Sequence, residues 1–148
     1  MNLHLRSATE HDLDLLAEMN KHLIEDEGSA NPMNQAELRQ RMLEWLRTPG
    51  WMVDLLANED EVVGYALYFY KNNPYDPDRR EAYLRQYFIR RGYRKKGYGL
   101  KGIELFRETR FQGIRTIEID VLDANLSGKG FWRRAGFLPY AINMKREI

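Results

Sequence analysis

The stretch Arg91-Gly92-Tyr93-Arg94-Lys95-Lys96-Gly97-Tyr98-Gly99 decides how we interpret this chain. It follows Glu81 to Arg90, a run rich in Tyr, Phe and Ile that predicts a strand, and it precedes a run of helical spacing that ends at Gly113. Residues 115–122 then alternate apolar and polar side chains, as a buried strand does. Strand, loop, helix and strand form a right-handed crossover, so we expect the two strands to be parallel.

The segments on either side predict the rest of the fold. Before the crossover we expect a strand at 3–6, helices at 9–27 and 34–47, a hairpin of strands at 51–57 and 62–70, and a loop at 72–78. After it we expect a weak helix at 125–135 and a last strand near Tyr140 to Lys145. The sequence therefore predicts an α/β (α+β) fold: a mixed, mostly antiparallel sheet with one central parallel pair and helices on both faces. We expect residues 1–148 to form a single domain.

Composition restricts the class of protein. The 148 residues are 43% hydrophobic and 30% charged, as in an ordinary globular domain. No stretch is apolar enough for a membrane helix, and the first residues lack the apolar core of a signal peptide. The absence of cysteine excludes a disulfide scaffold, a thiolate metal site and a cysteine nucleophile. His4, His11 and His22 have no ligand-like spacing, so we expect no metal site. Together, these features predict a cytoplasmic protein that uses no metal and no membrane.

Charge is divided unevenly along the chain. The net charge is +1, but residues 1–61 carry 13 acidic and 5 basic side chains, whereas residues 62–148 carry 9 and 18. Two interpretations stay open. Either the two halves attract each other, or the chain presents one surface for cations and another for anions.

The quoted stretch has the composition of a phosphate-binding loop. The bases at positions 90–101 are Arg90, Arg91, Arg94, Lys95, Lys96 and Lys101, with no acid among them. Glycine lets a ligand approach the main chain closely, and a helix N-terminus favours anions. A P-loop is excluded because no Gly-Lys-Ser/Thr follows. Residues 97–102 match Gly-x-Gly-x-x-Gly, but a dinucleotide fold would place this unit first and repeat it.

Two motifs resemble the GCN5-related N-acetyltransferase (GNAT) superfamily. Residues 94–99 look like its Gln/Arg-x-x-Gly-x-Gly/Ala signature, with Ile89 at the end of the strand before it. Asn125, Trp132 and the pair Gly136-Phe137 match a second motif in their spacing. Together with the order of the elements, the resemblance covers the whole chain and implies a GNAT-like fold.

The resemblance implies that the chain binds acetyl-CoA. The main-chain N–H groups of the loop would hold the pyrophosphate, the main chain near the strand end would pair with the pantetheine, and the second motif would reach the pantetheine region. The residues concerned are Phe88, Ile89, Arg94, Lys95, Lys96, Gly97, Tyr98, Gly99, Asn125 and Trp132. The family often has Tyr where Trp132 stands. An indole N–H gives up no proton at neutral pH, so Trp132 is expected to pack and not to act as an acid.

Acyl transfer to an amine sets further requirements. A base must take the proton of the attacking amine, and an N–H near Ile89 would contact the developing oxyanion. Candidate bases are Glu81 and Tyr83 on the same strand, and Glu118 and Asp120 on its neighbour. The first two helices usually wall the acceptor site in this family. We therefore expect the acceptor at Glu25, Asp26, Glu27 and Asn31, and expect it to carry positive charge.

The predicted activity is transfer of an acetyl group to an amine of a small molecule or a peptide. An acetyl-CoA-binding regulatory protein without turnover is an alternative, because the Tyr is missing. A nucleic-acid-binding module that uses Tyr93 and Tyr98 is a weaker one, since it leaves the glycine spacing unexplained. A homodimer and an acyl group longer than acetyl both stay open.

Overall fold

The computed structural model describes residues 2–148. Residues 2–148 contain five strands, four α-helices and two short 3-10 turns. In chain order they are β1 (Leu3–Ser7), η1 (Glu10–Asp12), α1 (Leu13–Asp26), α2 (Gln35–Arg47), β2 (Trp51–Asn58), β3 (Glu61–Asn73), β4 (Asp76–Ile89), η2 (Arg91–Tyr93), α3 (Tyr98–Glu108), β5 (Thr116–Glu118) and α4 (Leu126–Arg134). None of the helices in the described residues is both long and apolar enough to cross a membrane.

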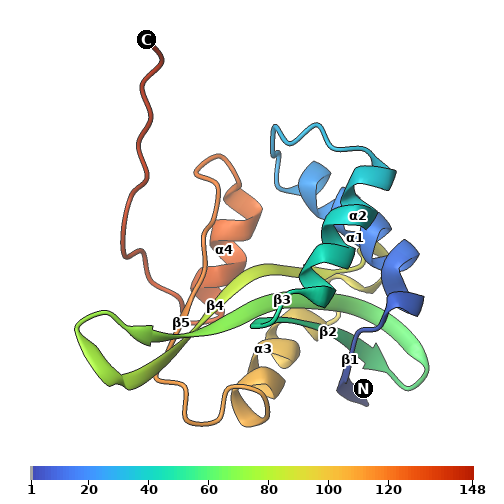
Figure 1. Ribbon diagram of the computed structural model, residues 1–148, viewed down its shortest axis with the longest axis horizontal. Helices are drawn as coiled ribbons and strands as arrows, with labels where there is room; N and C mark the ends of the chain where they lie inside the picture. Colours follow the sequence, from blue (N-terminus) through green and yellow to red (C-terminus); the bar gives the residue numbers. More distant parts are fainter. Residues whose placement is uncertain (1) are drawn as a thin grey trace.

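The strands form one mixed sheet in the order β1-β2-β3-β4-β5. The first four strands pair antiparallel, and β5 pairs parallel to β4, which confirms the predicted crossover. In Figure 1, α1 and α2 cover one side of the sheet and α3 lies on the other. Because no strand follows β5 within residues 2–148, the parallel pair lies at an edge of the sheet and not at its centre.

Alternation along the central strands divides the core into two parts. Leu55 and Tyr65 pack with the helices α1 and α2, whereas their neighbours Leu56 and Ala66 pack with α3. Each of these four side chains is fully buried. A strand buried on both faces reads as a continuous apolar run, which is why 51–57 and 62–70 were recognisable as strands.

Three predicted segments differ from the structure. β3 extends to Asn73 and β4 begins at Asp76, so most of the expected loop at 72–78 belongs to the two strands and only a tight turn joins them. The strand expected at 115–122 pairs only over Thr116–Glu118. The predicted last strand at 140–145 is wrong, because this segment forms no ladder with any described strand and runs away from the body (Figure 1). A strand pattern alone forms no strand without a partner to accept its hydrogen bonds.

A β-bulge at Arg85 changes which way β4 faces. Leu67 pairs with Gln86 and the next residue, Tyr68, pairs with Leu84, so Arg85 is the extra residue. Before the bulge, Leu84 packs on the α3 side; after it, the parity is reversed and Phe88 packs on the α1–α2 side. The bulge also lets Arg85 and Gln86 line one cavity, although alternation would send neighbours to opposite faces.

The two parallel strands separate directly before the bulge. Tyr83 and Glu118 are their last paired residues. From Ile119 to Val121 the main chain makes no hydrogen bond to any other residue between 2 and 148. One edge of β4 from Leu84 to Ile89 is therefore open, and this gap leads to the basic loop at the end of the strand.

Candidate functional site

The loop after β4 has a shape that its glycines permit. Gly97 precedes α3 with φ +85°, a left-handed conformation that side chains disfavour, and a Cβ there would meet nothing within 4 Å. Gly99 is needed for a different reason, because a Cβ on it would lie 2.7 Å from Cε1 of Phe131 in α4. We expected both glycines to let a ligand approach the main chain closely. Only Gly97 has free space at its Cβ position.

The loop leaves main-chain donors available. Within residues 2–148, the N–H groups of Lys95, Lys96 and Gly97 have no hydrogen-bond partner. The first bond of α3 runs from the N–H of Lys101 to the carbonyl of Gly97 at 3.1 Å, so the N–H groups of the first helical turn are unpaired too. The side chain of Tyr98, in contrast, is 8% exposed, and its hydroxyl accepts a hydrogen bond from Asn58.

Acidic residues of α1 neutralise part of the loop. Arg91 donates to Asp26 at 2.7 Å and to Glu25 at 3.1 Å, and Nη2 of Arg94 lies 2.7 Å from Asp26. Arg94 also donates through Nε to the carbonyl of Ile89 at 2.9 Å. Glu25 and Asp26 therefore hold the loop against α1, and the structure does not leave them free for an acceptor. Here the two oppositely charged halves of the chain attract each other.

Two effects act on the pKa of Asp26. Partial burial would raise the pKa, but the hydrogen bonds from Arg91 and Arg94 outweigh burial and lower it from its ordinary value. Lys95, Lys96 and Lys101 have no ion-pair partner among the described residues. They are the bases of the loop that can meet a bound anion.

The main chain of β4 presents alternate peptide groups to the gap. The N–H of Arg90 donates to the carbonyl of Val63 in β3, so the N–H and carbonyl of Ile89 point away from β3. The same alternation turns the main-chain N–H and carbonyl of Phe88 toward β3 and those of Tyr87 toward the gap. The expectation for Phe88 thus needs correction, because its main chain is occupied in the sheet, and Tyr87 takes its place beside Ile89.

Aromatic side chains connect β4 to α4. The ring of Trp132 lies 5.7 Å from Tyr87, 4.9 Å from Phe131 and 5.0 Å from Phe137, and it is half-buried. Trp132 therefore packs among three aromatic rings. Asn125 begins α4 as its N-cap, where its Oδ1 accepts the N–H of Gly128 at 3.0 Å.

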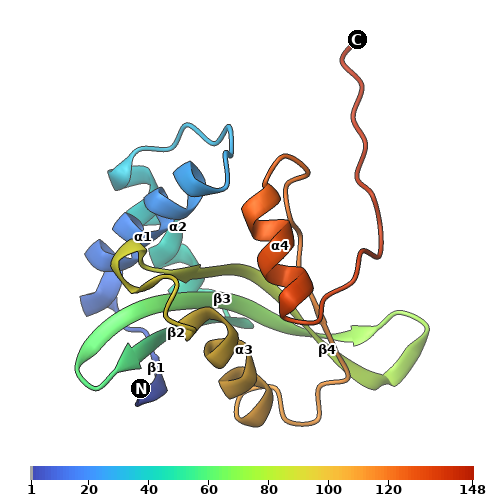
Figure 2. The ribbon, with the colours of Figure 1, turned by 180° about the vertical axis from the view of Figure 1, so that it is seen from behind.

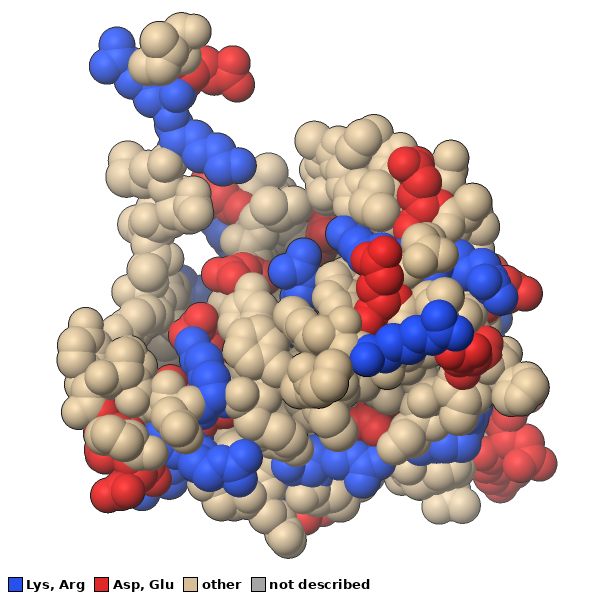
Figure 3. All heavy atoms as spheres, in the orientation of Figure 1, with Lys and Arg blue, Asp and Glu red and all other residues tan. Residues whose placement is uncertain are grey.

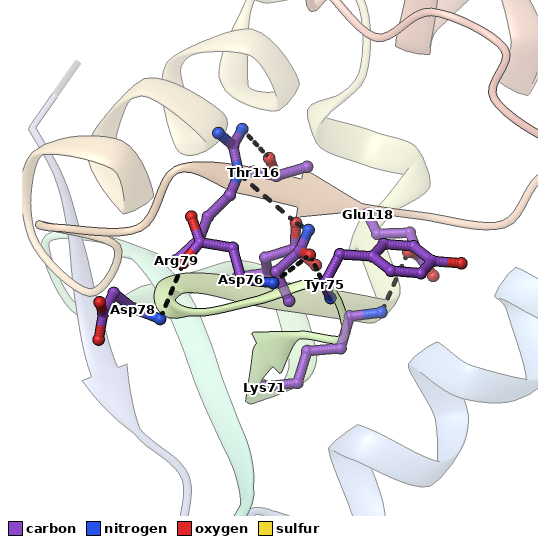
Figure 4. Close-up of polar contacts among 9 residues, drawn as sticks. Lys71, Tyr75, Asp76, Asp78, Arg79, Thr116 and Glu118 are labelled. Carbon is purple, nitrogen blue, oxygen red and sulfur yellow. Dashed lines mark hydrogen bonds and ion pairs between the residues drawn. The ribbon is translucent and has the colours of Figure 1, made fainter.

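The candidate bases Glu81 and Glu118 both have polar partners of their own. Figure 4 shows Lys71 reaching Glu118, with which it forms an ion pair at 3.1 Å. Glu81 is 7% exposed, accepts from Asn73 at 3.1 Å and has Arg79 at 3.9 Å. Glu81 and Ile89 pair with Lys71 and Gly64 of β3, which are seven residues, or about 23 Å, apart. The structure therefore does not bring Glu81 to the predicted oxyanion contact, and gives it a role in closing the hairpin.

Tyr83 and Asp120 form a pair across the opening of the gap. The hydroxyl of Tyr83 donates a short hydrogen bond to Asp120. Burial and this carboxylate raise the pKa of Tyr83 to about 12. A phenol with that pKa stays protonated at neutral pH, so Tyr83 is a donor there and not a base.

A cavity of about 260 Å³ lies between α1, α2 and the bulge. Its lining residues are Leu23, Ile24, Glu27, Ser29, Asn31, Arg41, Tyr83, Arg85 and Gln86. Two of the four predicted acceptor residues, Glu27 and Asn31, are among them. Burial raises the pKa of Glu27. No hydrogen bond or ion pair joins the Glu27 carboxylate to another residue between 2 and 148.

Sequence reasoning missed Arg41 and Arg85, which also face this cavity. Their guanidinium groups lie 4.7 and 5.2 Å from the ring of Trp45. Neither Arg has a carboxylate partner among the described residues, and Nε of Arg41 is buried without a hydrogen-bond partner. Burial lowers the pKa of Arg41, and repulsion from Arg85 lowers it further. Nothing local in the sequence marks either residue, because the bulge and α2 bring them together.

Residues 16–137 match the family described as "Acetyltransferase (GNAT) family". The chain belongs to this family. The matched span includes the loop at 94–99 and the segment from Asn125 to Phe137. No curated protein sequence matches the chain. Among residues 2–148, no group of three or more His, Asp or Glu side chains converges as a metal site.

Solved structures share the fold at low sequence identity. A possible acetyltransferase from Clostridium difficile 630 superposes with a TM-score of 0.78 at 18% identity, covering 100% of this chain and 98% of the other. A predicted acetyltransferase from Clostridium acetobutylicum, solved with acetyl-CoA, gives 0.72 at 17%, covering 98% and 96%. An aminoglycoside acetyltransferase from an uncultured soil metagenomic sample, in complex with sisomicin, gives 0.71 at 14%, covering 99% and 97%.

The ion pairs of Asp26 predict a pH-dependent stability. Because its pKa is lowered in the folded state, the stability from Asp26 is complete above its ordinary pKa of 3.8 and is lost as the pH falls through the lower value. Asp26→Asn should lower the urea midpoint at pH 7 and reduce the further loss between pH 5 and pH 2. Glu25→Gln is the control and should change both less. Identical midpoints of Asp26→Asn and wild type at pH 7 would contradict this assignment.

Proposed function

We propose that this GNAT protein transfers an acetyl group from acetyl-CoA to the amine of an acceptor that also carries an anionic group. The observation that carries the acetyl-CoA assignment is the set of unpaired N–H groups at 95–97, beside the open edge of β4. When bound, acetyl-CoA supplies the acetyl group as an activated thioester. The likeness to a structure solved with acetyl-CoA supports the same donor.

Different groups of the chain would bind different parts of acetyl-CoA. Main-chain N–H groups of Lys95 to Gly97 and the first turn of α3 would hold the pyrophosphate, because they are unpaired and the N-terminus of a helix favours an anion. Lys95, Lys96 and Lys101 would neutralise phosphate charge. The outward peptide groups of Tyr87 would pair with the pantetheine. The N–H of Ile89, whose carbonyl already accepts from Arg94, would donate to the oxygen that gains charge during transfer.

Glu27 is our candidate for the group that takes the proton of the acceptor amine. It replaces Glu81 and Tyr83, because it faces the cavity and lacks a partner within residues 2–148. An amine must lose its proton before it can attack, and a carboxylate with a raised pKa is better matched to that role than an ordinary one. Asn31 and Ser29 line the same cavity and would bind the amine.

Arg41 and Arg85 supply the reason to expect an anionic group on the acceptor. Two guanidinium groups that face one cavity, neither of them ion-paired with a carboxylate in residues 2–148, repel each other, and an anion would relieve that repulsion. Guanidinium forms paired hydrogen bonds with carboxylate or phosphate. The cavity therefore fits a small molecule with an amine toward Glu27 and a carboxylate or phosphate toward the arginines, and not a purely cationic acceptor.

The competing functions receive less support. A nucleic-acid module would need exposed aromatic side chains, but Tyr98 is buried and the hydroxyl of Tyr93 donates to Glu61. A binder without turnover rests on Trp132 standing where Tyr is common. A thiol has a solution pKa near 8.5, so a thiolate leaves without a dedicated acid and the missing Tyr does not abolish transfer.

Substitution of Gly97 tests acetyl-CoA binding. Gly97→Leu places a side chain over the unpaired N–H groups and should weaken CoA binding by roughly ten- to a hundredfold in calorimetry, as expected for one or two lost charge-assisted hydrogen bonds. Gly113→Leu is the matched control, because Gly113 also has positive φ with nothing within 4 Å of its Cβ position, but follows the other end of α3. Equal CoA affinity in the two folded variants would refute the proposed pyrophosphate site.

Turnover tests the acceptor site separately. In a panel that pairs each amine with an analogue bearing a carboxylate, we expect the carboxylate form to be acetylated. Glu27→Gln should then reduce kcat/KM by about a hundredfold, the typical effect of removing a general base. In the wild type, kcat/KM should rise as the pH passes the raised pKa of Glu27, and this limb should disappear in Glu27→Gln. Glu25→Gln is the control; if both variants lose activity equally, Glu27 is not the base.

A further inference from the structure

The bulge in β4 brings two neighbouring side chains, Arg85 and Gln86, to the wall of one cavity. Figures 1 and 2 show α1 and α2 lying over the part of β4 that follows the bulge. In the proposed function, Arg85 meets the anionic group of the acceptor together with Arg41. Gln86 lines the same cavity, and its contacts give it a role of its own.

The core occupies one end of the Gln86 amide. The hydroxyl of Tyr65 donates a hydrogen bond to Oε1 of Gln86 at 2.7 Å. Tyr65 is fully buried, and burial raises the pKa of its hydroxyl, so this hydroxyl keeps its proton at neutral pH. Nε2 of Gln86 makes no hydrogen bond within residues 2–148, and the residue is only half-buried. The amide therefore has its carbonyl toward the core and its NH2 group available to the cavity.

Asn20 keeps the Gln86 amide in this orientation. Asn20 is fully buried, and its Oδ1 accepts a hydrogen bond from Nη2 of Arg41 at 3.1 Å. Its Nδ2 has no hydrogen-bond partner, and the Asn20 amide lowers the pKa of Tyr65, as a nearby donor does. Because Asn20 offers Tyr65 a donor and not an acceptor, a reversed Gln86 amide would leave the Tyr65 proton without an acceptor.

This side of the cavity is lined by hydrogen-bond donors. A guanidinium group carries donors only, and Gln86 presents its NH2 group, so Arg41, Arg85 and Gln86 all offer N–H groups to the same cavity. Nε of Arg41 is buried without a partner. A ligand group that fits such a wall must accept hydrogen bonds, and a negative charge on it would also offset the two guanidinium charges.

Other arginines of α2 have carboxylate partners. Nε of Arg39 lies 2.7 Å from Asp14, and Nη2 of Arg47 lies 2.8 Å from Glu10. Figure 3 shows acidic and basic side chains next to one another over α1 and α2. Arg41 differs from these two arginines because it faces the cavity, and no ion pair within residues 2–148 involves it.

We propose that Gln86 is a specificity-determining residue of the acceptor site and that Tyr65 is its positioning residue. The NH2 group of Gln86 joins Arg85 in binding the anionic oxygens of the acceptor. This inference rests on the proposed function, since it concerns the same cavity. A carboxylate or phosphate presents only acceptors to the donors, whereas a neutral amide would turn its own NH2 group against them. A site built in this way rejects an analogue that leaves its donors unpaired.

The side-chain NH2 group of Gln86 provides a test that needs no turnover. Its NMR signals are identified as the pair that is lost in Gln86→Met. The probes are amino acids, each set beside its C-terminal amide and its aminophosphonate analogue. We expect the carboxylate or the phosphonate form to shift these signals and the amide form to leave them unchanged. The form that shifts them identifies the anionic group. If no anionic probe shifts the signals, or if the amide shifts them equally, the proposal is wrong.

Affinities from the same titrations measure the contribution of Gln86. Gln86→Met keeps the length of the side chain and removes its donor. It should weaken binding of the anionic form by roughly ten- to a hundredfold, as for one hydrogen bond to a charged group, and change binding of the amide form little. Gln40→Met is the matched control, because Gln40 is exposed on α2 and lines a neighbouring cavity that also includes Arg41. Equal losses in the two variants, or an unchanged affinity ratio in Gln86→Met, would overturn the proposal.

Tyr65→Phe tests the positioning role. It removes only the hydroxyl, so Gln86 can turn either end of its amide to the cavity, and the ratio of anionic to amide affinity should fall toward that of Gln86→Met. A general loosening of the core would weaken both forms alike, and an unchanged ratio would refute the role of Tyr65. Acetylation of the same probes is measured separately. Anionic probes that shift the Gln86 signals but are not acetylated would refute the proposed transfer and leave the binding role of Gln86 intact.

Discussion

The incomplete pairing of β4 with β5 is the constraint on which the rest of the structure depends. A parallel pair that continued to Ile89 would satisfy every main-chain group of β4 and leave no site. Pairing stops at Tyr83, and the bulge at Arg85 follows two residues later. The bulge reverses the parity of β4, so that Phe88 enters the core under α1 and α2 while the peptide groups of Tyr87 and Ile89 face the opening.

The same break in pairing explains how charge is arranged around the site. The chain after β4 must turn away from the sheet into α3, and it does so through a loop whose bases would repel one another. Asp26 and Glu25 hold Arg91 and Arg94, which fixes the loop against α1 and leaves the lysines for an anion. Arg41 and Arg85, in the cavity beside the bulge, form no ion pair within the described residues, and this cavity is where we place the acceptor.

Sequence patterns predicted the crossover, the two-sided core and the glycine loop, because each depends on neighbours within a few residues. They did not predict the bulge, since Leu84-Arg85-Gln86 alternates as acceptably in either register. They placed Glu81 with Ile89 on one strand, yet the strand is too long for both to act on one atom. They also assigned a strand to Tyr140–Lys145. That pattern describes the alternation of the side chains, but the segment forms no ladder with any strand in residues 2–148.

Amide hydrogen exchange of β4, resolved by residue, tests the central claim most directly. In the free protein, the amide of Phe88 should exchange slowly because it faces β3, while those of Tyr87 and Ile89 face the gap and should exchange faster. Addition of acetyl-CoA should slow the exchange of Tyr87 and Ile89 and leave Phe88 little changed. If acetyl-CoA binds and neither Tyr87 nor Ile89 gains protection, the open edge of β4 is not the binding site and the account is wrong.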